Sequence, residues 1–200
     1  MVKDGIYYGV ALAGAGVFFS GFLHPGAGAP FFLLAAFCLY FFRDPERPIP
    51  DGPVAVSPAD GKVVEIRPGP DGAQRVSIFL NVFDVHVNRS PIAGRVAEVR
   101  YSPGKFKVAS LAAASAENEQ NTVVVDDGRS RVVFKQIAGL VARRIVCHKR
   151  VGDQVQKGER FGLIKFGSRM DIILGPEWNL AVERGERVKA GSSILARHRG

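Results

Sequence analysis

Residues 5–42 contain no Asp, Glu, Lys or Arg, whereas charged and apolar residues are mixed throughout the remainder of the chain. Ile6 to Leu23 is an uncharged run of 18 residues, near the length that spans a hydrocarbon core at about 1.5 Å per residue. A Gly- and Pro-rich break at 24–30 separates it from a shorter apolar run, Phe31 to Phe42. The pattern predicts that residues 1–47 form a helical hairpin that crosses or deeply enters the bilayer.

Two alternatives compete with this membrane hairpin. Ala27-Gly28-Ala29 has the small residues of a signal-peptide cleavage site, but Pro30 and the second apolar run argue against cleavage. A buried helical pair in a soluble fold is the other alternative. Lys3, Arg43 and Arg47 flank the hairpin, which favours both of its ends on the cytoplasmic side. We therefore expect a cell-membrane protein whose main domain faces the cytoplasm.

From residue 48 onward, short apolar runs alternate with turn signals. Four Asp-Gly pairs mark the turns: Asp51-Gly52, Asp60-Gly61, Asp71-Gly72 and Asp127-Gly128. The one convincing helical stretch is the Ala-rich segment 106–117. The pattern predicts a mainly β (α+β) domain over 48–200, of barrel or sandwich type, with one or two helices.

A weak internal echo links residues 151–162 and 183–194, because each contains Gly-x-x-Val-x-x-Gly followed by apolar residues. Similar hairpins build biotin and lipoyl carrier domains. A carrier would display a lysine at an exposed hairpin tip beside a Met or an acidic residue, and the sequence contains no such tip. A membrane-tethered, carrier-like binding module therefore stays as the non-enzyme alternative.

The formal charge of +8 suits nucleic acid, an anionic membrane surface or an acidic ligand. The apolar N-terminal region favours the membrane, and no nucleic-acid-binding motif supports a nucleic-acid partner. Cys38 and Cys147 are the only cysteines, and we expect them to be reduced. The four histidines lack metal-ligand spacing, so we expect no metal site.

The most informative stretch is 161–174, which predicts a strand, a Gly167-Ser168 step and a second strand. A serine hydroxyl held against the preceding glycine carbonyl is placed to attack its own backbone. Glycine has no side chain to block that attack, and it tolerates strained dihedral angles. Taken alone, the same dipeptide also fits an ordinary turn or bulge.

Two further segments carry a resemblance. Residues 56–63 place Asp60 in a turn between strands, and residues 79–91 place His86 in an apolar strand that ends at a proline. Together with Gly167-Ser168, their order and spacing resemble the phosphatidylserine decarboxylase family in its short form. The resemblance covers about 42–176 and includes the segments 42–47 and 136–145.

This resemblance implies that the protein cuts its own chain between residues 167 and 168. Ser168 would attack the Gly167 carbonyl, His86 would take the hydroxyl proton, and Asp60 would orient the imidazole. Breakdown of the ester would leave a pyruvoyl group at position 168. The two resulting chains would stay associated, and a homodimer is left open.

The resemblance also implies decarboxylation of phosphatidylserine to phosphatidylethanolamine. The pyruvoyl group would act as the electron sink, and His86 would return a proton to the product. Arg143 or Arg144 would pair with the lipid phosphate or the serine carboxylate, while Asn118 and Phe83 are further substrate-binding candidates. Another amine-bearing lipid is the alternative substrate, because the hairpin argues against a free amino acid.

The chain departs from the longer members of that family at two positions. Arg169 follows Ser168 where those members have Thr, which leaves the self-cleavage chemistry intact. Phe83 stands where some of them have a second histidine, so any role of that histidine is absent here.

Overall fold

The computed structural model describes residues 2–105, 117–139, 144–165 and 167–199. The chain divides into two compact units, Met1–Glu46 and Arg47–Gly200. This boundary lies one residue before the expected one. Apart from Glu117, the helix expected at 106–117 lies outside the described residues.

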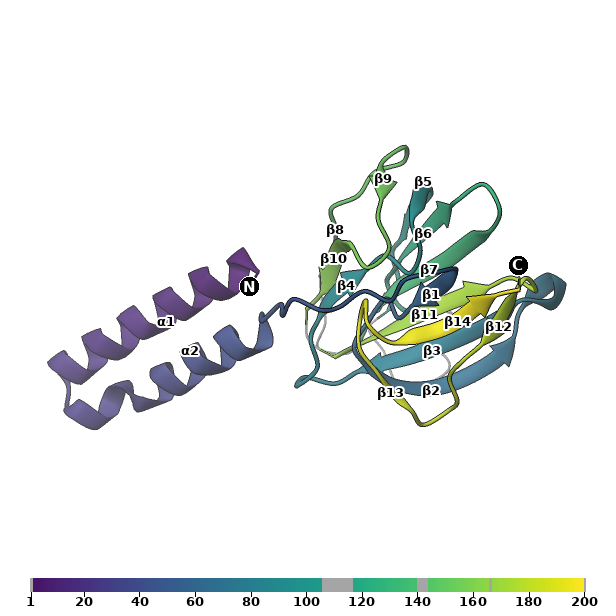
Figure 1. Cartoon of the computed structure of the whole chain (residues 1–200). Helices are drawn as coiled ribbons and strands as arrows, with labels where there is room; N and C mark the ends of the chain where they lie inside the picture. Colours follow the sequence, from purple (N-terminus) through teal and green to yellow (C-terminus); the bar gives the residue numbers. More distant parts are fainter. Residues whose placement is uncertain (1, 106–116, 140–143, 166, 200) are drawn as a thin grey trace. The chain divides into compact units, whose positions relative to one another are not determined.

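The first unit consists of two apolar helices, α1 (Lys3–Phe22) and α2 (Ala29–Phe41), joined by the short 3-10 helix η1 (Pro25–Gly28). The helices lie side by side and antiparallel (Figure 1). Gly9 and Gly16 of α1 allow this approach, since an added Cβ would lie 2.8 Å from Leu39 and Phe32, respectively.

The outer surface of this helical pair is apolar. Large side chains on both helices, including Phe22 and Leu33, are more than two-thirds exposed. By length and composition α1 is long enough to cross a membrane, whereas the apolar segment that contains α2 is shorter. Insertion into the bilayer stays a prediction, and these helices are compatible with it.

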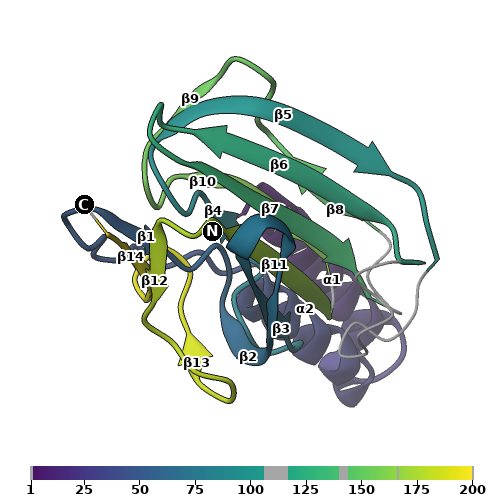
Figure 2. The same cartoon turned by 90° about the vertical axis from the view of Figure 1, so that its right-hand side faces the viewer.

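The second unit is built from antiparallel strands in three sheets. An eight-stranded sheet has the order β13-β2-β3-β11-β7-β6-β5-β9, and two three-stranded sheets have the orders β1-β14-β12 and β4-β10-β8. The strands are β1 (Val54–Val56), β2 (Gly61–Pro68), β3 (Gln74–Leu80), β4 (Val87–Arg89), β5 (Gly94–Ser102), β6 (Gln120–Asp126), β7 (Arg131–Ala138), β8 (Ile145–Cys147), β9 (Gln154–Val155), β10 (Arg160–Ile164), β11 (Ser168–Leu174), β12 (Trp178–Leu180), β13 (Arg187–Val188) and β14 (Ile194–His198). The expected mainly β domain is confirmed, and its large sheet is curled (Figure 2).

The core lies on the inner face of the large sheet. Met170, Ile172 and Leu174 alternate along β11 and are fully buried in this core, as the period of two in a strand requires. Arg169 and Asp171, at alternate positions of the same strand, lie on the other face and form an ion pair with an Nε–Oδ1 distance of 2.7 Å. Ser168 has the same parity as Met170, so it belongs to the inner face.

The second unit contains an internal pseudo-two-fold repeat that begins with two similar segments, 57–63 and 90–96. Both read Ser-Pro-x-x-Gly-[Lys/Arg]-Val. In both, the serine hydroxyl donates to the carbonyl two residues later at 2.7 Å, and the glycine has a large positive φ, 147° at Gly61 and 154° at Gly94. The segments also exchange backbone hydrogen bonds of 2.9 Å, Val56 N–H to Pro91 O and Arg89 N–H to Pro58 O.

The repeat extends over the whole large sheet, whose strand order is equivalent when read from either end. Strands β13, β2, β3 and β11 correspond to β9, β5, β6 and β7. The register of the central pair places Ile172 opposite Phe134, where the pseudo-two-fold axis passes. The sequence echo at 151–162 and 183–194 is therefore one part of a larger structural repeat.

Candidate active site

Ser168 is the first residue of β11, opposite Leu80 of β3 and Ala138 of β7. It is 0% exposed, and its Oγ has no hydrogen-bond partner among the described residues. Gly167 before it has a φ of 51°, a conformation that glycine adopts more readily than other residues. The expected strand, Gly-Ser step and second strand are confirmed. A buried hydroxyl without a partner costs free energy, which suggests that the position serves chemistry.

His86 lies in the loop between β3 and β4, not in a strand as the sequence suggested. The imidazole is 2% exposed, and its Nδ1 lies 2.9 Å from the backbone oxygen of Asp84. A carbonyl only accepts, so Nδ1 carries the proton and Nε2 holds the lone pair of the neutral ring. The His86 carbonyl accepts from Ile164 N–H at 3.4 Å, which ties this loop to the strand leading to Ser168.

Asp84 holds the loop in this conformation. Its carboxylate accepts from Asn81 N–H at 2.9 Å and forms an ion pair with Arg187 of β13. The Asn81 side chain in turn accepts from Phe83 N–H at 2.7 Å. Contacts among Asn81, Phe83 and Asp84 thus form a tight turn just before His86. The ion pair with Arg187 attaches this turn to β13.

Asp60 lies in the turn before β2, as expected, but its carboxylate binds other groups than the imidazole. Arg47 donates to both of its oxygens, with 2.8 Å from Nη2 to Oδ2, and Ala190 N–H donates at 2.8 Å. The described residues show no hydrogen bond from Asp60 to His86, whose Nδ1 is held by Asp84 instead. The strand order β2-β3-β11 separates Asp60 from Ser168 by two strand spacings, roughly 10 Å. Its catalytic role stays a prediction.

The pseudo-symmetric half provides an internal comparison for the serine. The register of β3 with β11 and of β6 with β7 makes Ser130 the counterpart of Ser168. Ser130 Oγ lies 3.4 Å from the Asp127 carboxylate, whereas Ser168 Oγ lacks a described partner. At equivalent backbone positions, the serine hydroxyl is therefore hydrogen-bonded in one half and unpaired among the described residues in the other.

Sequence reasoning missed a buried chain of three amides, whose middle member, Gln136, lies opposite Met170, two residues along β11 from Ser168. Asn121 Nδ2 donates to Gln136 Oε1 at 3.0 Å, and Gln136 Nε2 donates to Asn88 Oδ1 at 3.0 Å and to the Val146 carbonyl at 3.2 Å. That carbonyl fixes the orientation of Gln136, and thereby of Asn88. Asn88 Nδ2 is buried without a described partner. The alternation His86-Val-Asn88, which puts both polar residues on one side, was the available signal.

The substrate-binding candidates have different surroundings. Asn118 is buried, and its Nδ2 donates to the carbonyl of Ala138, the residue opposite Ser168, at 2.7 Å. Phe83 is 63% exposed in the His86 loop. Arg144 is exposed, and its carbonyl accepts from Lys165 N–H at 3.2 Å. Arg143 lies outside the described residues.

No cluster of three or more His, Cys, Asp or Glu side chains that could hold a metal ion occurs in the described parts of the chain. Fold and site together define a mainly β protein with a candidate self-processing serine at the start of a central strand. The family model described as phosphatidylserine decarboxylase matches residues 34–196. The chain belongs to the phosphatidylserine decarboxylase family.

Three relatives named phosphatidylserine decarboxylase proenzyme extend this comparison. The protein from Solibacter usitatus is 59% identical over 197 residues, which cover 98% of this chain and 96% of the relative. The protein from Solidesulfovibrio magneticus is 50% identical, covering 82% of this chain and 80% of the relative. That from Chlorobium phaeobacteroides is 45% identical, covering 92% and 89%.

Proposed function

We propose that this protein decarboxylates phosphatidylserine to phosphatidylethanolamine, using a pyruvoyl group formed from Ser168 when the chain cuts itself after Gly167. The observation that carries the proposal is the buried Ser168 hydroxyl, which lacks a described partner and follows a glycine at positive φ. The similar proteins are named as proenzymes of this activity. That name implies a precursor that must be processed.

His86 is the proposed base for the cleavage. With Nδ1 bonded to the Asp84 carbonyl, the lone pair on Nε2 can accept the Ser168 hydroxyl proton. The bond from Oγ to the Gly167 carbonyl carbon forms, the peptide C–N bond breaks, and the proton passes to the freed amine. Loss of the residue-168 α-proton then expels the Gly167 carboxylate. Water hydrolyses the remaining enamine and releases ammonia.

Asp60 supports the site through Arg47 in this proposal. Its turn needs no carboxylate, because Ala93 stands at the equivalent position of the second copy of the turn. The carboxylate therefore serves its contacts with Arg47 and Ala190 N–H. These contacts join the segment before β1 to the loop after β13, at the end of the large sheet where β11 begins.

Cleavage leaves residues 168–200 as a separate chain that begins with β11. Because β11 pairs with both β3 and β7 in the middle of the large sheet, the two chains would stay associated without a covalent link. Gly167 and Ser168 fit the group, since position 168 starts a buried strand with no described partner on its oxygen. The pyruvoyl group supplies the electron sink for decarboxylation. His86 would return the proton to the substrate carbon.

The substrate is a membrane lipid, and the apolar helical pair would hold the enzyme at the bilayer. We propose that the β unit faces the cytoplasm, in keeping with the basic residues that flank the hairpin. Exposed Phe83 in the His86 loop would contact the lipid near its headgroup. Arg144 and Asn118 are proposed to help to bind the headgroup, with Arg143 as the alternative arginine.

Intact mass spectrometry of purified protein tests the proposal. We expect two chains split between Gly167 and Ser168, with a carbonyl-reactive N-terminus on the small chain and carbon dioxide released from phosphatidylserine vesicles. Ser168→Ala should remain one chain, whereas Ser193→Ala, in the loop before β14, should be cleaved normally. A cleaved Ser168→Ala chain, or a cleaved wild type without decarboxylation, would refute the corresponding step.

A further inference from the structure

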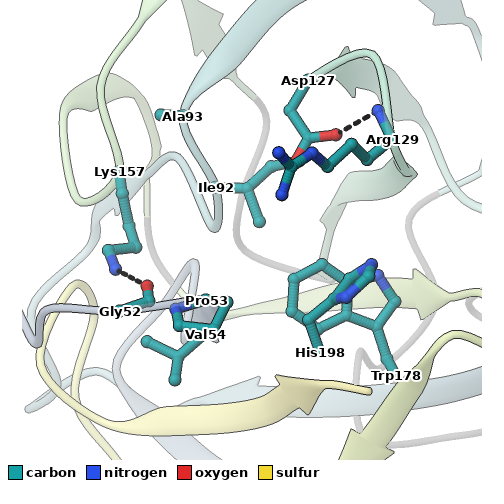
Figure 3. A pocket seen from close by; sticks show the side chains of 10 residues that line it. All are labelled: Gly52, Pro53, Val54, Ile92, Ala93, Asp127, Arg129, Lys157, Trp178 and His198. Atoms are coloured by element: carbon teal, nitrogen blue, oxygen red, sulfur yellow. Dashed lines mark hydrogen bonds between the residues drawn. The ribbon is translucent and has the colours of Figure 1, made fainter. Parts of the chain in front are cut away.

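A cavity lies at the opposite end of the large sheet from Ser168. It has a volume of about 220 Å³ and is shown in Figure 3. Its lining combines apolar, aromatic and charged side chains: Pro53, Val54, Ile92, Lys157, Trp178 and His198, with Asp127 and Arg129 at the β6–β7 turn. Ser168 is paired with the last residue of β7, so about seven residues of strand, roughly 20 Å, separate the serine from this turn.

This cavity is the pseudo-symmetric counterpart of the candidate active site. The paired turns make Ala93 equivalent to Asp60 and Pro53 equivalent to His86. The paired registers make Arg129 equivalent to Gly167. At the positions equivalent to Asp60, His86 and Gly167, the second site therefore has neither an acid, nor a base, nor a glycine, although the same backbone elements enclose its cavity.

The second site has gained cationic groups at two of the equivalent positions. Lys157 corresponds to Ala190, because the next residues, Gly158 and Gly191, donate to the equivalent carbonyls of Ser90 and Ser57 at 2.8 Å. The Lys157 ammonium lies 2.8 Å from the Gly52 carbonyl at one wall. The Arg129 guanidinium reaches over the cavity toward Ile92, across from the rings of Trp178 and His198 (Figure 3). Substitution of a methyl by an ammonium and of a glycine by a guanidinium would change what the cavity can bind.

One residue of the lining carries an unsatisfied donor. Trp178 is 4% exposed, and its Nε1–H has no hydrogen-bond partner among the described residues. The indole can only donate, so it requires an acceptor. The one carboxylate in the lining, Asp127, already accepts from Arg129 N–H at 2.9 Å and Ser130 N–H at 2.7 Å.

We propose that this cavity binds a phosphate-class oxyanion, either free or on a lipid headgroup, as a second and non-catalytic ligand site. Lys157 and Arg129 neutralise the charge, and the Trp178 indole donates to one oxygen. The internal duplication explains its origin: one copy of the site does chemistry, while the other encloses a cavity that binds an anion. The inference does not depend on cleavage at Ser168.

Trp178 is the only tryptophan in the chain, so it reports on this cavity directly. Full-length protein in neutral detergent is titrated with sodium phosphate against sodium chloride at equal ionic strength, while the single indole N–H signal is followed by ¹⁵N NMR. We expect a saturable shift with phosphate only. If the wild-type indole signal shows no saturable shift with phosphate, the proposal is wrong, and no variant is needed to reach that conclusion.

Variants then assign the binding groups. Lys157→Gln combined with Arg129→Gln should weaken phosphate binding at least tenfold. Arg131→Gln removes an exposed charge beside the same turn and should leave binding unchanged, as should Ser168→Ala at the other end of the sheet. A shift that persists in the folded double variant would disprove the assignment. If the double variant does not fold, the wild-type titration alone tests whether the cavity binds phosphate.

The source of the anion is resolved by two further titrations of the wild type. Glycerol 3-phosphate represents a small soluble phosphate, and phosphatidylglycerol in bicelles represents a headgroup, with phosphatidylcholine bicelles as background. Saturable displacement of bound phosphate by either ligand supports the site and identifies its source. If neither phosphate ester competes, the site takes free phosphate alone, and the headgroup as its source is ruled out.

Discussion

Asp60 and Ala93 occupy equivalent positions in two copies of the same turn. Both copies have a serine hydroxyl donating to the carbonyl two residues later at 2.7 Å. The glycine that follows has a positive φ in each, 147° and 154°. Because alanine suffices for the backbone in one copy, the carboxylate in the other is explained by what it binds, Arg47 and Ala190 N–H.

The Asp60–Arg47 pair is nearly buried, so we expect Asp60→Ala to destabilise the protein by about 3 kcal/mol, chiefly by leaving the guanidinium without its carboxylate. Urea unfolding measures the change. The double variant with Arg47→Met should recover part of the loss, since the buried charge is gone. If the turn itself required the carboxylate, the second substitution would recover nothing.

The double variant of Asp60 and Arg47 also tests whether Asp60 affects self-cleavage apart from its effect on stability. Once Arg47→Met has relieved the unpaired charge, we still expect the double variant to cleave more slowly than the wild type, by at least tenfold, because the contacts near the start of β11 are lost. Time-resolved gel analysis measures the rate. Wild-type cleavage in a stable double variant would remove Asp60 from the proposed mechanism.

The ion pair between Asp84 and Arg187 positions the loop that carries His86. Because the Arg187 side chain is 60% exposed, Arg187→Ala should cost less than about 1 kcal/mol of stability. We nevertheless expect slower cleavage, as the imidazole is held less firmly. Arg184→Ala, at an exposed arginine of the neighbouring turn, is the matched control. Equal cleavage rates in both variants would argue that the pair has no positioning role.

The chain of buried amides should be sensitive to loss of its middle member. Gln136→Leu leaves Asn88 Oδ1, Asn121 Nδ2 and the Val146 carbonyl without their partner, and we expect a loss of about 2–3 kcal/mol. Gln120→Leu is the comparison, because its Oε1 already lacks a described partner. Thermal unfolding of the two variants should differ clearly. Similar melting temperatures would mean that the amide chain contributes little.

Asp127 makes stability depend on pH. Burial opposes its ionisation, but hydrogen bonds from Ser130 and Arg129 and the charge of His198 outweigh burial and lower its pKa. A lowered folded-state pKa stabilises the protein above the unfolded value near 3.8, and this contribution is lost as pH falls through the folded value. Asp127→Asn should therefore destabilise by less than about 1 kcal/mol at pH 7, because the group is partly solvated.

The difference in unfolding free energy between wild type and Asp127→Asn should shrink in acid. Urea titrations at pH 7 and at pH 3 measure it, with Asp51→Asn as a control for the general loss of an exposed carboxylate. A difference that stays constant or grows toward low pH would contradict a lowered pKa of Asp127 in the folded state.

Several local features followed from the sequence alone. The glycines of all four Asp-Gly pairs have positive φ, because glycine adopts that conformation without steric cost. The apolar character of α1 and the alternation along β11 could likewise be predicted, since each depends only on residues close in sequence. The Gly167-Ser168 step between two strands could be predicted for the same reason.

The tertiary structure decided which distant residues meet. Asp60 was expected to hold His86, yet it binds Arg47 and Ala190, while the Asp84 backbone holds the imidazole. His86 itself lies in a loop, because a turn centred on Asn81 and Asp84 interrupts the apolar run.

The internal duplication shows most clearly which features local sequence predicts and which only the tertiary structure determines. The sequence displayed only a faint echo at 151–162 and 183–194, and the cavity at the β6–β7 turn had no sequence signal. Its lining comes from segments that are remote in the chain and are brought together by the order and register of the sheet. Turn and strand preferences act over a few residues, whereas register is set by the packing of one whole inner face against another. Local sequence therefore determined the elements, and only their packing determined the two sites.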